Sequence, residues 1–292
     1  TGGAGFIGSN IVNSLVDAGH GVVVIDNESS DAHEYFHYND KAKYYRHDIC
    51  DYDKIKYLFE GVDTVFHCAA EARIQPAIIN PLKAVMTNSY GTCSVLQAAR
   101  EAGVRRVVYS STSSAYGLVN QIPNAETQPD DCLNPYSVSK VSGEKLCKMY
   151  SDLFGLETVV FRYFNVYGEN QPTKGQYAPV IGLFLKQRKN KEPLTIVPDG
   201  EQRRDFTHVS DVVSANILAS TVKLETYGQV FNVGTGTNFS VNEIAKLISD
   251  DTVLIDPRPG ESRETLADIT KTKKTLGWNP RVQLEDWIAQ QL

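Results

Sequence analysis

Short apolar runs alternate along the first half of the chain with longer segments in which apolar residues recur at helical spacing. The short runs predict β-strands at Val22–Asp26, Lys43–His47, Thr64–Cys68, Arg106–Ser110 and Val159–Tyr163. The longer segments predict helices near Phe6–Gly19, Lys54–Glu60, Leu82–Glu101 and Pro135–Leu153. Because strands and helices alternate, and the strands are apolar almost throughout, we predict an α/β fold with a doubly wound parallel sheet that is covered on both faces.

After about residue 165 prolines become frequent and the predicted elements shorter. The pattern predicts helices near Val180–Lys189 and Asp211–Lys223, a strand at Val230–Val233 and a helix that starts at Ser240. We therefore expect residues 1–165 to form the sheet domain and residues 166–292 to form mainly a smaller lobe, with a return of the chain to the first domain left open. The crevice between such a lobe and the carboxyl ends of the strands is where open α/β sheets bind ligands.

Composition and charge narrow the class of protein. Of the 292 residues, 41% are hydrophobic and 22% charged, which is typical of a globular chain with an apolar core. The net charge of −6 argues against nucleic-acid binding, and no apolar run is long enough to predict a membrane span. The five cysteines are widely spaced and form no C-x-x-C motif, so we expect neither a disulfide framework nor a zinc site, and a cytoplasmic location.

The chain opens with T-G-G-A-G-F-I-G, which places Gly2, Gly5 and Gly8 directly before a helical pattern. Glycines at this spacing allow a tight turn and a close approach of the backbone to a pyrophosphate, whose charge the helix N-terminus favours. Asp26, at the end of the next strand, can accept hydrogen bonds from an adenosine ribose and would repel a 2′-phosphate, which favours NAD over NADP. Since no strand precedes Thr1, we expect further β-forming residues there in the intact protein.

A second motif pairs a tyrosine with a lysine. Asn134 and Pro135 suit the start of a helix, and Tyr136 and Lys140 then lie on one face of it. An ammonium group and a bound nicotinamide would both favour the phenolate, which could take a proton from a sugar hydroxyl. The hydroxyl-rich run from Ser110 to Ser114 follows a predicted strand and could bind the reacting oxygen. Taken singly, these motifs also fit a surface tyrosine beside a solvated lysine and a polar turn.

These motifs together resemble the extended short-chain dehydrogenase/reductase family, and within it the NAD-dependent UDP-sugar 4-epimerases, which have a Rossmann-like sheet domain. The likeness extends over essentially the whole chain. Besides the segments above, it includes His47-Asp48-Ile49, His67-Cys68-Ala69-Ala70, Asn88, R-Y-F-N-V-Y-G from Arg162, Arg204-Asp205-Phe206 and Arg258-Pro259-Gly260-Glu261.

The resemblance implies a role for each matching position. It implies NAD contacts for Gly2, Gly5, Phe6, Ile7, Gly8, Asp26, Asn27, Asp48, Ile49, Ala69, Ala70, Asn88, Ser110, Tyr136, Lys140 and Tyr163. It implies catalytic roles for Thr112, Tyr136 and Lys140. It implies substrate contacts for Thr112, Tyr136, Asn165, Arg204, Arg258, Glu261 and Thr265. The two arginines suit a nucleotide diphosphate, because a guanidinium group pairs bidentately with phosphate oxygens, although an arginine is more commonly found in a surface salt bridge.

The run after the hydroxyl-rich strand favours one reaction of the family. The related 4,6-dehydratases carry Thr-Asp-Glu there, whereas this chain has Thr112-Ser113-Ser114 and no carboxylate for eliminating water. The resemblance therefore implies epimerisation, an isomerase reaction. A hydride leaves the sugar's fourth carbon, the 4-keto sugar rotates, and the hydride returns to the opposite face.

The size of residue 265 bears on the sugar. In the resembling family the side chain at this position limits the space for the sugar's 2-substituent. The resemblance implies that the small Thr265 leaves room for an N-acetyl group. We expect a UDP-GlcNAc/UDP-GalNAc 4-epimerase that also accepts UDP-glucose and UDP-galactose. One alternative is a UDP-glucuronate epimerase or decarboxylase, for which Arg73 is the candidate carboxylate ligand. Another is an NAD-responsive binding protein without catalysis.

Two helices carry apolar residues on more than one face, which indicates either full burial or a partner. In the predicted helix Leu82–Glu101 these apolar residues are Val85, Met86, Val95 and Leu96. In the predicted helix Pro135–Leu153 they are Val138, Val141, Leu146, Met149 and Leu153. In the resembling family these helices form a four-helix bundle across a two-fold axis, which implies a homodimer. We expect His67 and His208 to be structural, and we expect no metal.

Overall fold

Four parallel strands form the larger sheet of the computed structural model, which describes residues 1–174, 178–257 and 262–292. In their order across the sheet they are β3 (Thr64–His67), β4 (Arg106–Thr112), β5 (Glu157–Tyr163) and β9 (Gln229–Val233). All seven residues of β4 are buried, because helices cover both faces of the sheet. The predicted α/β fold with a doubly wound parallel sheet is confirmed.

A second parallel pair lies beside this sheet, formed by β1 (Val23–Ile25) and β2 (Lys43–Tyr45). Residues 1 and 2 bond to strands of both sheets. The Gly2 amide donates to the Ile25 carbonyl at 2.8 Å, and the Cys68 amide donates to the Thr1 carbonyl at 3.1 Å. The glycine loop therefore starts where the carboxyl ends of β1 and β3 meet.

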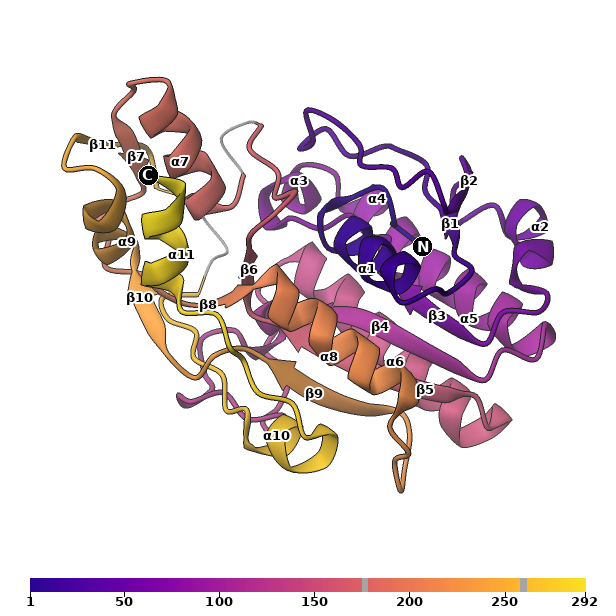
Figure 1. The fold of residues 1–292 in the computed structure, drawn as a ribbon. Helices are drawn as coiled ribbons and strands as arrows, with labels where there is room; N and C mark the ends of the chain where they lie inside the picture. The colour runs from indigo at the N-terminus through magenta and orange to yellow at the C-terminus, as the bar shows by residue number, and fades with distance from the viewer. Residues whose placement is uncertain (175–177, 258–261) are drawn as a thin grey trace.

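Helices cover each face of the larger sheet (Figure 1). One face carries α1 (Phe6–Asp17) and α8 (Val209–Thr221), whereas the other carries α5 (Thr92–Glu101) and α6 (Pro135–Phe154). The α6 helix starts where the sequence predicts, because the Asn134 side chain accepts a hydrogen bond from the Ser137 amide at 2.9 Å.

The predicted helix Leu82–Glu101 is not continuous. It is divided into α4 (Pro81–Val85), a π-helical segment η2 (Met86–Gly91) and α5. Within η2 the Asn88 side chain hydrogen-bonds to the backbone of Glu71 and to the Ser139 hydroxyl of α6, which holds η2 against α6. Such contacts leave no trace in hydrophobic periodicity, so the sequence could not predict the interruption.

Lys54–Glu60 was also predicted as one helix and is instead a short α-helix followed by a 3₁₀ turn. These are α2 (Tyr52–Ile55) and η1 (Lys56–Phe59). Among the described residues, the sequence did not predict four further helical elements, α3 (Ile74–Ile79), η3 (Ser113–Tyr116), α10 (Thr270–Leu276) and α11 (Leu284–Gln291). Each has only four to eight residues, too few to establish a helical period.

In the part of the chain that the structure describes, the smaller lobe combines short strands with helices (Figure 1). One sheet has the order β10 (Asn238–Ser240), β8 (Arg203–His208), β6 (Asn165–Tyr167), and a second pairs β7 (Leu194–Ile196) with β11 (Thr252–Leu254). The helices are α7 (Val180–Lys189), α9 (Val241–Ile248) and α11 (Leu284–Gln291). Their core includes Phe184, Ile244 and Trp287. The bounds of α7 are those that the sequence predicts.

The last third of the chain contributes to both parts of the molecule. Strand β9 pairs in parallel with β5, and α8 packs on the larger sheet through Val212 and Ala215, so both belong to the larger part. Among the described residues, none of the helices has the length and hydrophobicity that a bilayer crossing requires.

Candidate active site

A cleft of about 510 Å³ lies between the carboxyl ends of the larger sheet and the smaller lobe. It brings together side chains from the glycine loop, from β4 and α6, and from the segment around residue 265. The candidate residues that line it are Gly2, Gly5, Phe6, Ile7, Gly8, Asp26, Asn27, Ile49, Ala69, Ala70, Ser110, Thr112, Tyr136, Lys140, Tyr163, Asn165, Arg204 and Thr265. The candidate site is therefore one continuous surface.

Four candidate residues are not part of the described lining. Asp48 accepts a hydrogen bond from the Asn27 side chain at 2.8 Å, so it helps to position Asn27, which lines the cleft. Asn88 is buried and bonds to Glu71 and Ser139, as described above. Arg258 and Glu261, predicted to bind the nucleotide diphosphate, lie outside the described residues.

The glycine loop meets strict steric requirements at two of its positions. Gly2 has a φ of +70°, and a Cβ added to it would lie 2.5 Å from the Ala69 amide nitrogen. A Cβ on Gly8 would lie 2.0 Å from the Gly2 carbonyl oxygen. At Gly5 the nearest atom to an added Cβ is 3.6 Å away, an ordinary van der Waals contact, so sterics alone do not require glycine there. The loop is thus close-packed at Gly2 and Gly8 and borders the cleft, which suits the close approach of a pyrophosphate.

Asp26 joins the loop to the end of β1. One carboxylate oxygen accepts from the Ala4 amide at 3.0 Å, and the other accepts from the Glu28 amide at 2.8 Å. Each oxygen retains a lone pair for a ribose hydroxyl, because a carboxylate accepts about four hydrogen bonds. The loop and this carboxylate together fit an adenine dinucleotide.

Helix α6 carries Tyr136 and Lys140 to the cleft, opposite the end of β4. Burial raises the pKa of the Tyr136 phenol, while a hydrogen bond with the Thr112 side chain lowers it. Burial lowers the pKa of Lys140 to about 8, and its ammonium group lies 4.2 Å from the centre of the Tyr109 ring. In the free protein burial therefore favours the neutral forms of both groups.

A buried ion pair that was not predicted from the sequence supports this end of the sheet. Glu144 follows Lys140 by one helical turn, and its carboxylate accepts hydrogen bonds from Arg162 at 2.9 and 2.7 Å and from the Ser111 hydroxyl. These bonds link α6 to β5 and β4. The spacing of Tyr136, Lys140 and Glu144 on one helix face is the signal that could have identified Glu144.

Tyr163 has a partner that no sequence pattern predicts. Its hydroxyl accepts a hydrogen bond from the Asn216 amide of α8 at 2.8 Å and lies 3.2 Å from the Ser110 hydroxyl. Asn216 is fully buried and comes from a part of the chain far from β5.

In the smaller lobe, Thr265 is held at the cleft wall by backbone contacts. Its amide donates to the Arg203 carbonyl at 3.1 Å, and its hydroxyl is buried without a hydrogen-bond partner among the described residues. Nearby, the Asp205 carboxylate accepts hydrogen bonds from the amides of Thr235, Gly236 and Ala267. This carboxylate joins three segments, one of which carries Thr265 into the cleft.

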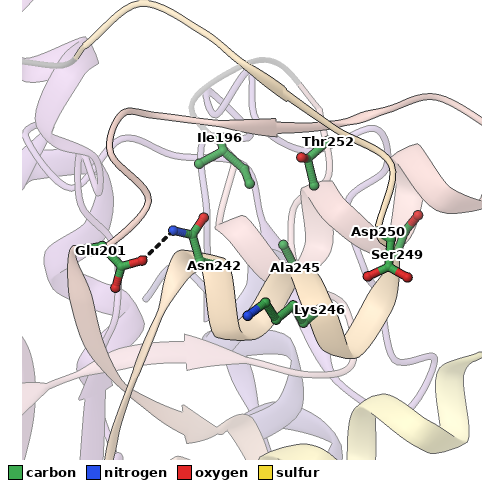
Figure 2. A pocket seen from close by; sticks show the side chains of 8 residues that line it. All are labelled: Ile196, Glu201, Asn242, Ala245, Lys246, Ser249, Asp250 and Thr252. Atoms are coloured by element: carbon green, nitrogen blue, oxygen red, sulfur yellow. Dashed lines mark hydrogen bonds between the residues drawn. The ribbon is translucent and has the colours of Figure 1, made fainter.

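Figure 2 shows a second hollow, of about 240 Å³, beside β7 and α9. Its lining includes Lys246 and Asp250, and the Asn242 amide donates to Glu201 at 2.6 Å. None of the candidate residues lines it. Because the glycine loop, Tyr136 and Lys140 all line the larger cleft, we place the candidate active site there.

His67 and His208, two of the six histidines, hydrogen-bond to neighbouring protein groups. His67 is buried between the hydroxyls of Thr1 and Thr92, and the His208 ring accepts a hydrogen bond from the Ser210 amide at the start of α8. All five cysteines are free thiols. Within the described ranges, no group of three or more histidine, cysteine, aspartate or glutamate side chains could hold a metal ion.

Comparison with known proteins gives the class. Residues 1–234 match the NAD dependent epimerase/dehydratase family. The chain belongs to this family, which confirms the resemblance to extended short-chain dehydrogenases/reductases and the expectation of NAD as cofactor.

Three relatives show how far the similarity extends. A putative UDP-glucose 4-epimerase of Methanocaldococcus jannaschii is 38% identical, over 99% of this chain and 95% of the relative. A UDP-glucose 4-epimerase of Thermotoga maritima, solved with UDP-glucose, has a TM-score of 0.92 at 35% identity and covers 98% of this chain and 94% of its own. A UDP-N-acetylglucosamine 4-epimerase of Methanobrevibacter ruminantium, solved with UDP-N-acetylmuramic acid, has a TM-score of 0.91 at 32% identity, with coverages of 99% and 94%.

Proposed function

We propose that this chain is an isomerase that inverts the fourth carbon of a UDP-hexose. The observation that carries the proposal is the convergence of Thr112, Tyr136 and Lys140 on the cleft that the glycine loop and Asp26 also line. Relatives named as UDP-sugar 4-epimerases, similar over almost the whole chain, support the same reaction.

Each residue has a task that follows from its position. Tyr136 takes the proton of the sugar's 4-hydroxyl and later returns it, while the Thr112 hydroxyl bonds to the same oxygen and holds it in place. Once the Lys140 amine is protonated, its positive charge stabilises the Tyr136 phenolate. Bound NAD supplies the acceptor and donor of the hydride at the sugar's fourth carbon. Arg204 and Asn165 hold the nucleotide diphosphate, so that the oxidised sugar can turn without leaving the cleft.

The residues after Thr112 favour epimerisation over dehydration. Elimination of water needs an acid to protonate the leaving hydroxyl, and Ser113 and Ser114 supply no carboxylate there. The Ser114 amide instead donates to the Thr112 hydroxyl at 3.1 Å, which fixes the orientation of Thr112.

We infer that the preferred substrates are UDP-GlcNAc and UDP-GalNAc and that UDP-glucose and UDP-galactose are also accepted. Thr265 is small and lines the cleft, and the N-acetylglucosamine epimerase among the relatives supports the larger sugar. Room for the larger sugar does not exclude the smaller one. For UDP-glucuronate, Arg73 is the candidate ligand in the cleft, but its guanidinium group already pairs with Asp31 at 2.5 Å.

A homodimer is part of the same proposal. Helix α6 packs beside α3, α4 and η2, and this region exposes apolar side chains that a partner helix pair would bury. The exposed side chains are Ile79, Leu82, Val85, Met86, Val138 and Leu153. A four-helix bundle between two copies would cover them.

The function is tested by incubating the protein with UDP-GlcNAc, UDP-glucose and UDP-glucuronate separately and measuring the C4 epimers by NMR. We expect epimers of the first two, with deuterium at the fourth carbon retained on that carbon. Tyr136→Phe should lower turnover at least about 100-fold, because it removes the group that transfers the proton.

The thermal shift that NAD induces serves as the control for Tyr136→Phe. It should remain, because the substitution removes a single hydroxyl. Binding of NAD with no epimerisation of any sugar by the wild-type protein would instead support the non-catalytic alternative.

A further inference from the structure

A segment that the proposed reaction does not use lies over the glycine loop. We call residues Asp31–His37 the strap. The His37 amide donates to the Ala4 carbonyl at 3.0 Å, which fixes one end of the strap to the loop. The Lys174 amide donates to the Ala32 carbonyl at 3.4 Å, and Glu34 pairs with Lys186 of α7. The strap therefore connects the glycine loop to the smaller lobe.

His33 is the strap residue that faces the loop. Its Nε2 lies 3.7 Å from the place where a Cβ on Gly5 would sit, so the imidazole lies directly beside this loop position. Its ring lines the cleft together with Gly5 and Arg73, and the Phe36 ring lies beside it with a centroid distance of 5.8 Å. A phosphate bound at the loop would therefore lie within reach of this imidazole.

The surroundings of His33 keep the imidazole neutral in the free protein. Burial lowers the pKa of His33 most, and the nearby His37 and Arg73 lower it further, whereas Asp26 raises it. A pyrophosphate would bring two negative charges to the same place, and these favour the imidazolium form.

We propose that His33 binds the pyrophosphate of NAD and takes up a proton when the cofactor binds. The strap then acts as a lid over the glycine loop whose grip on the cofactor depends on pH. This inference rests on NAD being the cofactor and is independent of which sugar the protein acts on.

The direction of the pH dependence follows from linkage. Because the bound form holds the proton more tightly than the free form, affinity for NAD is highest at low pH. It falls as pH rises between the two pKa values of His33, by at most about tenfold per pH unit. Within that window binding takes up close to one proton.

Calorimetry on the full-length chain freed of nucleotide measures this uptake directly. Titrations at pH 7 in two buffers with different ionisation heats give the number of protons bound with each ligand. We expect uptake with NAD and with ADP and none with adenosine, which lacks phosphate. His33→Gln should abolish the uptake and weaken NAD and ADP about tenfold, while leaving adenosine unchanged.

His37→Gln is the matched control, because it removes the neighbouring imidazole of the same strap. It should leave most of the proton uptake in place, since burial lowers the pKa of His33 more than His37 does. A titration with UDP tests whether His33 responds to the diphosphate of the cofactor or to that of the substrate. If His33 serves the cofactor, uptake with UDP is absent or is unaffected by His33→Gln. Unchanged uptake of protons with NAD in His33→Gln would overturn the proposal, as would an equal loss of affinity for adenosine or a loss confined to UDP.

Discussion

Thr265 shows how one small side chain can determine the reach of the cleft. It comes from an irregular segment of the smaller lobe, and its exposed fraction is only 5%. The Thr265 amide donates a hydrogen bond to the Arg203 carbonyl, which fixes the backbone at the cleft wall. In the proposed function, room for a 2-substituent on the sugar depends on the volume of this residue.

We expect Thr265→Tyr to lower turnover of UDP-GlcNAc at least about 100-fold and that of UDP-glucose less than about tenfold. The loss of an acetamido-sized space blocks only the larger sugar, and steric exclusion of this kind is worth several kcal/mol. Parallel kinetics on both sugars measure the ratio. Thr265→Ser, which keeps the space, should retain both activities. Equal losses on both sugars in Thr265→Tyr would refute the assignment of this residue as a gate.

At the scale of the element, α6 is held to the sheet by charge as well as by apolar packing. The Glu144 carboxylate and the Arg162 guanidinium group are both almost fully buried and form a bidentate pair. At the opposite end of the same sheet Arg106 pairs with Glu157, which is partly exposed. Comparing the two Arg–Glu pairs measures how the exposure of the carboxylate changes the contribution of an ion pair to stability.

We expect Glu144→Gln to lower the free energy of unfolding by about 2 kcal/mol, because the buried Arg162 guanidinium loses its bidentate partner and keeps only the Asp130 carboxylate as counter-charge. Glu157→Gln should cost about 1 kcal/mol, since water reaches that carboxylate and the Arg106 guanidinium keeps its bonds to the Ala219 and Val222 carbonyls. Urea denaturation followed by circular dichroism compares them. Only Glu144→Gln should also slow turnover, because it releases the helix that carries Tyr136 and Lys140. Equal effects of both variants on turnover would contradict this interpretation.

At the scale of the whole molecule, the active cleft is formed by two parts that the chain enters more than once. Strand β9 and helix α8 return to the larger sheet after the chain has already entered the smaller lobe. The apolar surface over α4, η2 and α6 lies on the larger part. The proposed homodimer would therefore leave the smaller lobe of each copy free of the interface.

We expect Met86→Glu to convert a dimer into a monomer at micromolar concentration, because it places a charge on this apolar surface, where Met86 is 55% exposed. Sedimentation equilibrium measures the mass. Leu254→Glu is the control, since Leu254 is similarly exposed on β11 of the smaller lobe and should leave the dimer intact. A wild-type protein that sediments as a monomer would remove the dimer from the proposal.

Much of the larger part was predictable because its elements are long and regular. The fully buried strand β4 and the capped helix α6 carry their signals within the segment itself, as an apolar run and as Asn134-Pro135. The strands of the smaller lobe were not predicted. β6, β7, β10 and β11 have three residues each, which is too short for a periodic pattern. β8 has six residues but begins with Arg203-Arg204-Asp205, which gives no apolar run.

The sequence by itself determined what depends on local geometry. The glycine spacing, the position of Asp26 after a strand and the placement of Tyr136 and Lys140 on one helix face all follow from backbone geometry and helical periodicity. Only the tertiary structure decided contacts that no sequence pattern indicated: Asn216 against Tyr163, and His33 beside Gly5. Such contacts join segments far apart in the chain, and packing of the whole molecule, rather than any local pattern, brings them together.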